Sequence, residues 1–209
     1  MISGPFRDRR LSRRDFVAGA GAAGWAVGMT LAGCGPGPNG PETKTPTCGE
    51  YTPTNIEGPF YTPSSPERGS LVAAETPGTR LRIEGTVYAS SCEVLPGAWI
   101  DFWHADHEGA YDNVGFNLRG HQFTDQAGRF RLETIVPGRY LNGATYRPAH
   151  IHVKVGGVLG AAMLTTQLYF ADDPFNADDP WIEDGLIMAV ADDGSGGQQA
   201  LFDFVLPRT

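Results

Sequence analysis

Cysteine, basic residues and long apolar stretches are all scarce in this chain. Only three of its 209 residues are cysteine, and none of them shares the close spacing of a zinc-binding cluster. Lysine and arginine number 16 against 24 aspartate and glutamate residues, which gives a formal net charge of −8. We therefore expect no nucleic-acid partner.

The first 34 residues have the features of an export signal rather than of a folded segment. Residues 12–16, Ser-Arg-Arg-Asp-Phe, form a twin-arginine signature, and residues 17–33 are apolar but too short and too rich in glycine and alanine to span a membrane comfortably. The run ends in Leu-Ala-Gly-Cys34, which resembles the lipobox of bacterial lipoproteins. A plain cleavage site or an uncleaved anchor is the alternative. We predict export to the cell envelope, with a lipid anchor on Cys34.

Residues 35–50 are rich in proline, glycine and threonine, a composition that buries too little apolar surface to fold. We expect a flexible spacer there, followed by one folded domain over residues 51–209. We see no internal repeat and no second linker. Cys48 and Cys92 form an even pair in an exported chain, and whether they are joined in a disulfide stays open at this point.

Alternation of apolar and polar residues predicts β-strands in the folded part. The segments are residues 80–88, 98–103, 129–134, 163–170 and 201–206. Turn-forming residues separate them at short intervals, for example Pro96-Gly97 and Pro137-Gly138. No segment has the pattern of a long amphipathic helix. We predict a mostly-β fold, an antiparallel β-sandwich with long loops and few helices.

His150 and His152 lie two positions apart in a run expected to be a strand. Side chains alternate faces along a strand, so both imidazoles point to one side while Ile151 points to the other. A strand presents metal ligands in this way. Taken alone, the His-x-His pattern fits the polar face of a half-buried strand equally well.

A metal site needs more donors than two imidazoles, and two tyrosines are candidates. Tyr111 follows Gly109-Ala110, and Tyr140 ends the segment Pro137-Gly138-Arg139-Tyr140 shortly before the histidine strand. Both tyrosines are flanked by turn-forming residues.

From residue 52 to residue 173 the chain resembles the intradiol ring-cleavage dioxygenases, the non-haem ferric enzymes that open catechols between their two hydroxyl groups. The similar segments are residues 57–61, 85–87, 97–98 with Trp103, 109–111, 147–152 and 164–170. The resemblance implies four iron ligands, which fall on Tyr111, Tyr140, His150 and His152. It also implies that the long loops of the sandwich surround the active site.

The implied metal, Fe(3+), is a hard cation, and phenolate oxygen is a hard donor that favours the oxidised ion. A trivalent ion lowers the pKa of a tyrosine from its usual value of about 10, so that the phenol binds deprotonated. By resemblance, Tyr140 leaves the metal when a catechol chelates it and takes up a substrate proton. Tyr111 stays bound.

The resemblance gives catalytic roles to two further residues. Arg147 matches an arginine thought to stabilise the anionic, ketonised form of the substrate, and its alternative is an exposed arginine paired with an acid. Gln167 matches a position near the iron, and its alternative is ordinary strand polarity.

Aromatic residues and other histidines complete the candidates. Phe60 and Tyr61 would line the substrate cavity with Trp103 packed beneath it, although aromatic residues at such positions are more often part of a core. The histidines to which we assign no role are His104, His107 and His121.

These features predict an exported, lipid-anchored ferric dioxygenase that inserts both atoms of O2 into a catechol-type ring and forms a muconate-type diacid. The alternatives are a non-catalytic transthyretin-like sandwich and an iron-dependent binder of catechols or catecholate siderophores. No helical dimerisation segment precedes the core, residues 141–146 form a compact loop, and an export signal is present. Oligomeric state and substrate therefore do not carry over from the resemblance.

Overall fold

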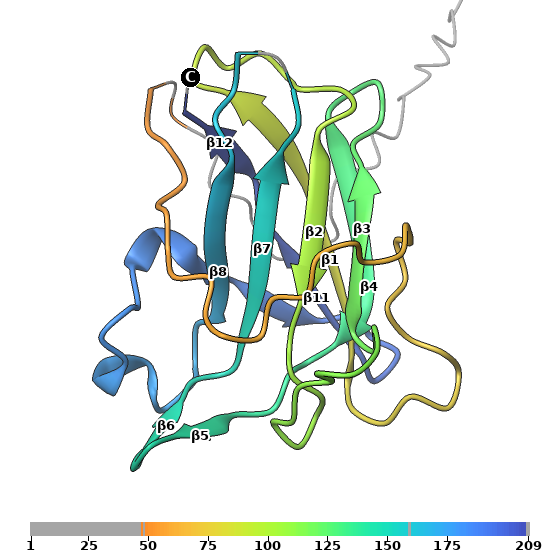
Figure 1. Cartoon of the computed structure of the whole chain (residues 1–209), viewed down its shortest axis with the longest axis vertical. Coiled ribbons are helices and arrows are strands. Elements are labelled where there is room, and N and C mark those ends of the chain that lie inside the picture. Colours follow the sequence, from red (N-terminus) through yellow and green to blue (C-terminus); the bar gives the residue numbers. More distant parts are fainter. Residues whose placement is uncertain (1–46, 48, 159, 208–209) are drawn as a thin grey trace, which may run out of the picture. The chain divides into compact units, whose positions relative to one another are not determined.

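The computed structural model of the protein describes residues 47, 49–158 and 160–207 (Figure 1). The predicted signal peptide, Cys34, Cys48 and most of the expected spacer lie outside these residues. The described part contains strands and two 3-10 helices, and none of its helices is long and apolar enough to cross a membrane. In chain order the elements are β1 (Arg80–Ala89), β2 (Trp99–Trp103), β3 (Arg119–Phe123), β4 (Arg129–Ile135), β5 (Tyr140–Asn142), β6 (Thr145–Arg147), β7 (His150–Gly156), β8 (Leu164–Phe170), η1 (Asn176–Asp178), η2 (Asp184–Leu186), β9 (Ile187–Met188), β10 (Val190–Asp192), β11 (Gln198–Leu201) and β12 (Phe204–Leu206).

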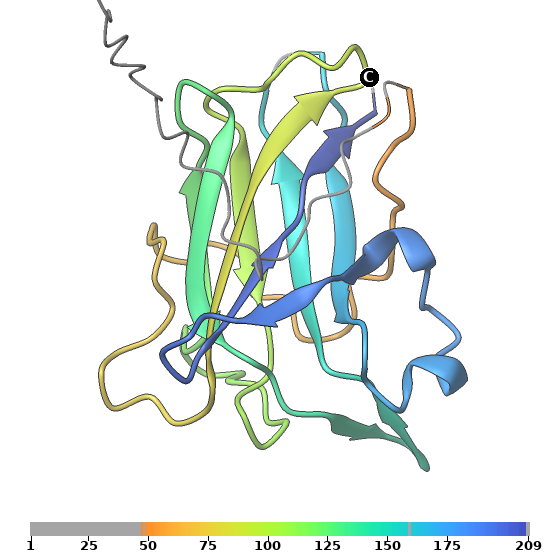
Figure 2. The ribbon, with the colours of Figure 1, turned by 180° about the vertical axis from the view of Figure 1, so that it is seen from behind.

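The strands form two five-stranded sheets and one small hairpin. The front sheet, nearest the viewer in Figure 1, has the order β3-β2-β7-β8-β9. In the back sheet, seen best in Figure 2, β11 and β12 pair with successive parts of β1, β10 pairs with β11, and β4 also pairs with β1. The third sheet is the hairpin β5-β6. The mostly-β prediction is confirmed, but the sheets are mixed, because β1 runs parallel to β11 and β12, and β8 runs parallel to β9.

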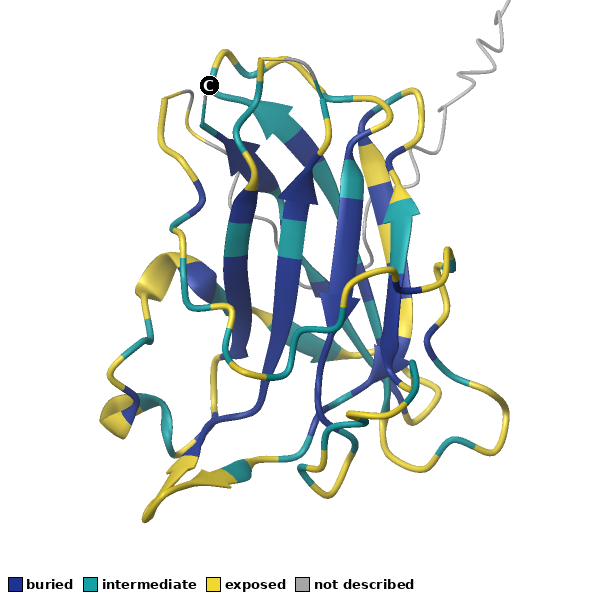
Figure 3. Ribbon diagram, in the orientation of Figure 1, coloured by how far each residue is buried: buried dark blue, intermediate teal, exposed yellow. Residues whose placement is uncertain are grey.

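Apolar side chains from the facing sides of the two sheets form one core. In β7, Ile151, Val153 and Val155 are fully buried and alternate with the outward-pointing histidines. Phe130 on the back sheet bridges the layers, with its ring centroid 5.9 Å from that of Phe102 on the front sheet. Figure 3 shows how far the buried residues extend along the central strands. Each large apolar side chain buried in this way contributes roughly 1.5–3 kcal/mol.

The expected strand over residues 201–206 is interrupted in the structure. Phe202 donates its main-chain N–H to the Glu84 oxygen at 2.9 Å, and the Asp203 carboxylate accepts the N–H of Thr86 at 2.7 Å. These bonds hold a bulge between β11 and β12 directly over Gly85, where a Cβ would lie 1.7 Å from the Phe202 oxygen. The bulge explains why one apolar run becomes two short strands.

Cys92 is disulfide-bonded and adopts a positive φ of 65° in the turn after β1. Its partner lies outside the described residues. The question of a bridge from Cys92 to Cys48 therefore concerns a residue that the structure does not describe.

Candidate metal centre

The outer face of the front sheet is polar and aromatic, whereas its inner face is apolar. In the strand register, His152 on β7 lies opposite Trp103 on β2 and opposite Gln167 on β8. His150 lies opposite Tyr169. Residues that pair across neighbouring strands point to the same side of a sheet, so these side chains share the outer face. The prediction that His150 and His152 point to the same side is confirmed.

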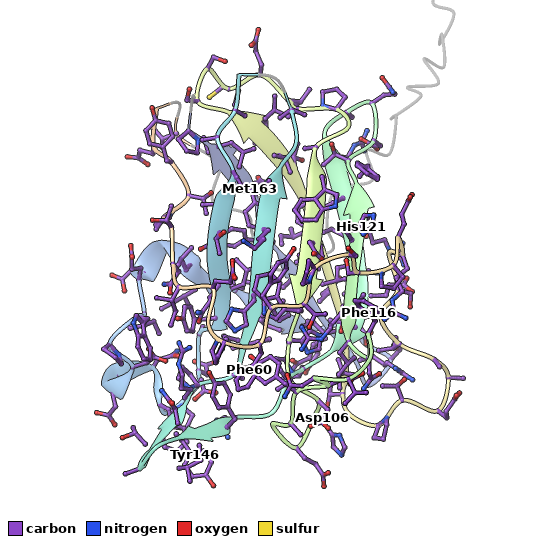
Figure 4. All side chains as sticks on the ribbon, in the orientation of Figure 1. Phe60, Asp106, Phe116, His121, Tyr146 and Met163 are labelled. Atoms are coloured by element: carbon purple, nitrogen blue, oxygen red, sulfur yellow. The ribbon has the colours of Figure 1, made fainter. Side chains whose placement is uncertain are left out.

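The segment before β1 crosses in front of β8, β7 and β2 (orange in Figure 1), and at Gly58 it comes close to His152. At Gly58 the backbone has a φ of +71°, and a Cβ there would lie 3.2 Å from Cε1 of His152. Only glycine allows the chain to pass so close in this conformation. Two residues later, Phe60 (Figure 4) stacks on Tyr111 with ring centroids 4.3 Å apart and 19° between the planes.

Two loops in close backbone contact bring the tyrosines together. A Cβ on Gly109 would lie 2.2 Å from the Arg139 oxygen, and a Cβ on Gly138 would lie 2.4 Å from the Gly109 nitrogen. Gly138 also donates its N–H to the Asp106 oxygen at 2.7 Å. The glycines in the two turn-rich segments therefore let the loop before Tyr111 pack against the loop before Tyr140.

The four predicted ligands converge. The Tyr111 hydroxyl oxygen lies 3.1 Å from Nε2 of His152 and 3.5 Å from Nε2 of His150. The Tyr140 ring centroid is 5.6 Å from that of Tyr111 and 5.6 Å from that of His150. The two imidazole centroids are 4.8 Å apart. Two phenol rings and two imidazoles from separate segments thus surround one point.

Hydrogen bonds and burial set the protonation of these groups. Nδ1 of His150 lies 2.7 Å from the Pro148 carbonyl oxygen, which can only accept, so Nδ1 carries the proton and Nε2 has a free lone pair. Burial lowers the pKa of His150 to about 3 and lowers the pKa of His152 well below its usual value. Burial raises the pKa of the Tyr111 hydroxyl. The imidazoles are neutral, as a metal requires, while Tyr111 needs a strong positive charge beside it to ionise.

The donor set fits a hard or borderline cation with oxygen and nitrogen ligands. Among the described residues, no group of three or more histidine, cysteine, aspartate or glutamate side chains is placed to hold a metal. The tyrosine oxygens are therefore needed to complete any site built on His150 and His152.

Arg147 and Gln167 lie beside these four residues in a buried network. Arg147 is 4% exposed, which contradicts its alternative as an exposed strand-end arginine. One of its terminal nitrogens donates to the Gln167 side-chain oxygen at 3.0 Å and to the Tyr169 hydroxyl at 3.0 Å. Gln167 in turn donates to the Ile56 carbonyl at 2.8 Å. Gln167 thus links Arg147 to the segment that covers the site.

A family model described as "Dioxygenase" matches residues 56–207 of the chain. The chain belongs to the intradiol ring-cleavage dioxygenase family. It is 33% identical over 153 residues to a catechol 1,2-dioxygenase of Acinetobacter baylyi, covering 61% of this chain and 49% of that enzyme. It is 32% identical over 181 residues to a chlorocatechol 1,2-dioxygenase of Pseudomonas putida, covering 73% and 67%. The chain therefore spans about half to two thirds of the length of these two relatives.

A solved structure covers the same region. It is the dioxygenase domain of a dioxygenase and carbohydrate-binding protein fusion from Streptomyces sp. SirexAA-E, with 46% sequence identity and a TM-score of 0.70. The match covers 77% of this chain and 100% of that domain.

Three residues around this site were not anticipated from the sequence. Asp179 accepts a hydrogen bond from Nε of Arg147 at 2.8 Å and is buried. The Trp181 ring lies 4.6 Å from the guanidinium carbon of Arg147. Tyr169 donates its hydroxyl proton to Gln167 at 2.9 Å. The sequence feature that could have pointed to Asp179 and Trp181 is the motif Asp-Pro-Trp at residues 179–181, but nothing in its spacing links it to Arg147.

The aromatic candidates and the remaining histidines lie around the centre. Trp103 packs beneath it as expected, with its ring 4.9 Å from that of His152, and Tyr61 packs on the indole at 4.8 Å. His104 is buried and bonded to Ala105 and Thr134. His121 is bonded to Ser65, and His107 is exposed.

Proposed function

We propose that this chain is a ferric intradiol dioxygenase that cleaves a catechol-type ring with O2, incorporates both oxygen atoms and yields a muconate-type dicarboxylate. The convergence of Tyr111, Tyr140, His150 and His152 on one point is the observation that supports the proposal most directly. The relatives named above are catechol and chlorocatechol 1,2-dioxygenases, which favours a catechol-type substrate with O2.

Members of this family typically depend on ferric iron. We propose that Tyr111, Tyr140, His150 and His152 hold it through two phenolate oxygens and two Nε2 atoms. When bound, the ion would supply a hard Lewis acid that a catechol can chelate and that favours ionisation of the catechol hydroxyl groups. The imidazoles of His150 and His152 are neutral and almost completely buried, which suits such a centre.

The two tyrosines differ in how firmly they are held. Tyr111 stacks on Phe60, and its hydroxyl oxygen lies 3.1 Å from Nε2 of His152, so two neighbours fix its ring. Tyr140 lies on the β5-β6 hairpin, which projects away from the two sheets (Figure 1). We therefore assign to Tyr140 the role of the ligand that moves aside, with its phenolate oxygen taking up a proton from a substrate hydroxyl group to become a phenol.

Arg147 supplies positive charge to the substrate side of the site. Its partner Tyr140 lies directly opposite it in the hairpin register. A guanidinium keeps its charge when buried, and Asp179 together with Gln167 fixes its plane. We propose that Arg147 stabilises negative charge that develops on the substrate, and that Gln167 positions Arg147.

The proposed location is the cell envelope, with residues 1–34 as a twin-arginine signal, residues 35–50 as a spacer and residues 51–209 as the catalytic domain. The sequence motifs at residues 12–16 and at Cys34 support this. Detergent phase partitioning of the full chain and of Cys34→Ala tests the anchor. A full chain that stays in the aqueous phase when produced in a lipoprotein-processing host would contradict it.

The visible absorption spectrum of the domain lacking residues 1–34 tests the function, with iron content measured alongside. We expect a tyrosinate-to-iron band that shifts when catechol is added without oxygen and decays when oxygen enters. A shift without decay would favour the catechol binder instead, and a protein with neither iron nor a band would favour the non-catalytic sandwich. Tyr140→Phe should change the band and abolish turnover.

A further inference from the structure

The loop after β8 contains the same four-residue pattern twice. Residues 172–175 are Asp-Asp-Pro-Phe, and residues 178–181 are Asp-Asp-Pro-Trp. No internal repeat was expected from the sequence, because each copy is short and lies outside the strands. The structure shows that the two copies make equivalent contacts.

In each copy, the second aspartate binds an arginine through the same atoms. Asp173 accepts a hydrogen bond from Nε of Arg139 at 2.8 Å, and Asp179 accepts one from Nε of Arg147 at 2.8 Å. The side chains of both aspartates are almost completely buried, at 2% and 1% exposure. A buried carboxylate is stable only when it is paired and hydrogen-bonded, so these contacts are structural requirements of each copy.

The aromatic residue of each copy completes the contact with the same arginine. The other oxygen of each carboxylate accepts the main-chain N–H of the aromatic residue, Phe175 at 3.0 Å and Trp181 at 2.9 Å. The Phe175 ring lies 5.7 Å from the guanidinium carbon of Arg139, and the Trp181 ring lies 4.6 Å from that of Arg147. Each copy thus holds one guanidinium by an ion pair and a cation–π contact.

The two arginines lie side by side at the open end of the β5-β6 hairpin, opposite its turn. Arg139 precedes Tyr140, the first residue of β5, and Arg147 is the last residue of β6 and the register partner of Tyr140. Asp173 also accepts the main-chain N–H of Ala149 at 3.0 Å, through the oxygen that binds Arg139. A single carboxylate oxygen therefore holds the residue before Tyr140 and the residue before His150.

Apart from these bonds, the hairpin is held by ring contacts. Tyr146 packs on Phe175 of the first copy, with ring centroids 5.4 Å apart, and Tyr140 packs on Phe60 and His150. The outward residues of the hairpin, Leu141 and Tyr146, are 56% and 48% exposed, and Tyr146 is seen on the hairpin well away from the sheets (Figure 4). A two-stranded ribbon is marginally stable by itself in water. The position of Tyr140 therefore depends on what holds the open end of the ribbon.

We propose that this tandem Asp-Asp-Pro-aromatic motif sets the position of Tyr140 relative to His150, with Asp173 and Asp179 as positioning residues. The outer copy, built on Asp173, is the one to test, because Arg139 is 45% exposed and touches none of the proposed catalytic groups. Its consequence for iron rests on the function proposed above. The positioning itself is a property of the metal-free protein.

The first test is proton NMR of the metal-free wild-type domain and of Asp173→Asn. The rings of Tyr140 and His150 are 5.6 Å apart, and those of Tyr111 and His152 are 6.1 Å apart, so each pair should give nuclear Overhauser cross-peaks. In Asp173→Asn we expect the Tyr140–His150 cross-peaks to be lost and the Tyr111–His152 cross-peaks to remain. The matched control is Asp172→Asn, which removes the same charge from the exposed first aspartate of the same copy and should change neither.

The second test is iron binding by the same variants. We expect Asp173→Asn to raise the iron dissociation constant roughly tenfold or more, the scale of one lost charge-assisted hydrogen bond, and to shift the tyrosinate band. Asp172→Asn should match the wild type. If Asp173→Asn melts at a lower temperature but keeps the cross-peaks and the iron affinity, Asp173 merely anchors the fold and the proposal is wrong.

Two results of these experiments, a variant that does not fold and a wild type that binds no iron, call for a further measurement. If Asp173→Asn does not fold, Arg139→Gln removes the same ion pair from the exposed side and should weaken the same cross-peaks, and an unchanged spectrum would then refute the positioning role. If the wild type binds no iron, the proposed function fails, but the cross-peaks of the metal-free protein still decide whether the motif positions Tyr140.

Discussion

The imidazole of His152 lies flat against the indole of Trp103, with ring centroids 4.9 Å apart and 8° between the planes. Trp103 is 1% exposed and is the register partner of His152 across β2 and β7. Gly58 covers the imidazole at Cε1. The ring is therefore confined by neighbours that leave its Nε2 directed at the Tyr111 oxygen.

Removing the indole should loosen this histidine. We expect Trp103→Ala to lower the free energy of unfolding by roughly 3–5 kcal/mol, as for other large aromatic residues in a core, and to weaken iron binding. Trp103→Phe keeps a stacked ring and should retain most of the iron affinity. Urea unfolding and iron titration of both variants check this. If Trp103→Phe lost as much iron affinity as Trp103→Ala, stacking on His152 would not be what holds the ligand.

A methyl group at Gly58 should disturb the same histidine through its Cε1 atom. Gly58→Ala places a Cβ 3.2 Å from the ring of His152 in a backbone with a φ of +71°, so either the ring or the covering segment must move. We expect weaker iron binding and a shifted tyrosinate band. Gly97→Ala is the matched control, because Gly97 has a φ of +70° and nothing lies within 4 Å of its Cβ position. Equal effects of the two variants on iron would mean that backbone strain, not contact with His152, is responsible.

The pairing of the buried guanidiniums predicts a preference among substrates. Arg147 is bound to Asp179, and Arg119 donates to the main-chain oxygens of Asp112 and Phe60. Neither arginine is therefore left unpaired for a carboxylate carried on the substrate ring. We expect kcat/KM for catechol to exceed that for protocatechuate roughly tenfold or more, because burying an unpaired charge is costly.

The uncharged analogue 4-methylcatechol separates charge from size in this comparison. It has a substituent at the same ring position as protocatechuate, so it should be turned over at a rate close to that of catechol. Equal turnover of protocatechuate and 4-methylcatechol would show that the site has a partner for the carboxylate after all.

Local pattern was enough to predict the histidine strand but not all of its neighbours. Alternation in residues 147–152 gave the common direction of His150 and His152, since a strand has a fixed period of two. The strand β3 was missed, because Arg119–Phe123 contains mostly polar residues and is recognisable as a strand only through its pairing with β2. The bulge at Gly85 likewise depends on a contact with Phe202, far along the chain.

The two tyrosine ligands could be predicted only from the resemblance to a family, and the remaining residues of the site became evident only from the tertiary packing. Tyr111 and Tyr140 meet because the backbone at Gly109 and Gly138 comes into contact, which no local pattern states. Asp179 pairs with Arg147 across a sequence separation of 32 residues. Such a partner follows from the path of the loop after β8, and this path is set by tertiary contacts and not by the propensity of its residues.

The buried His104 predicts how stability falls in acid. Its Nδ1 donates to the Ala105 oxygen at 2.7 Å, its Nε2 lies 2.6 Å from the Thr134 hydroxyl, and burial lowers the pKa of the ring to about 4. In the unfolded chain a histidine has a pKa of about 6.5. As the pH falls below 6.5, His104 becomes protonated in the unfolded chain but stays neutral in the folded protein. The free energy of unfolding therefore decreases until the pH reaches about 4. This one group accounts for a loss on the order of 3 kcal/mol across that window.

Urea unfolding of the metal-free domain between pH 7 and pH 4 measures this loss. His150 and His152 add to the slope in the wild type, because burial lowers the pKa of each ring. His104→Gln should therefore reduce the slope by about one proton, or roughly 1.4 kcal/mol per pH unit, whatever it does to stability at neutral pH. His107→Gln, at an exposed position, is the matched control for the loss of a histidine. If His104→Gln left the slope unchanged, the ring would take up its proton at the same pH in the folded and the unfolded protein, and burial would not be what keeps it neutral.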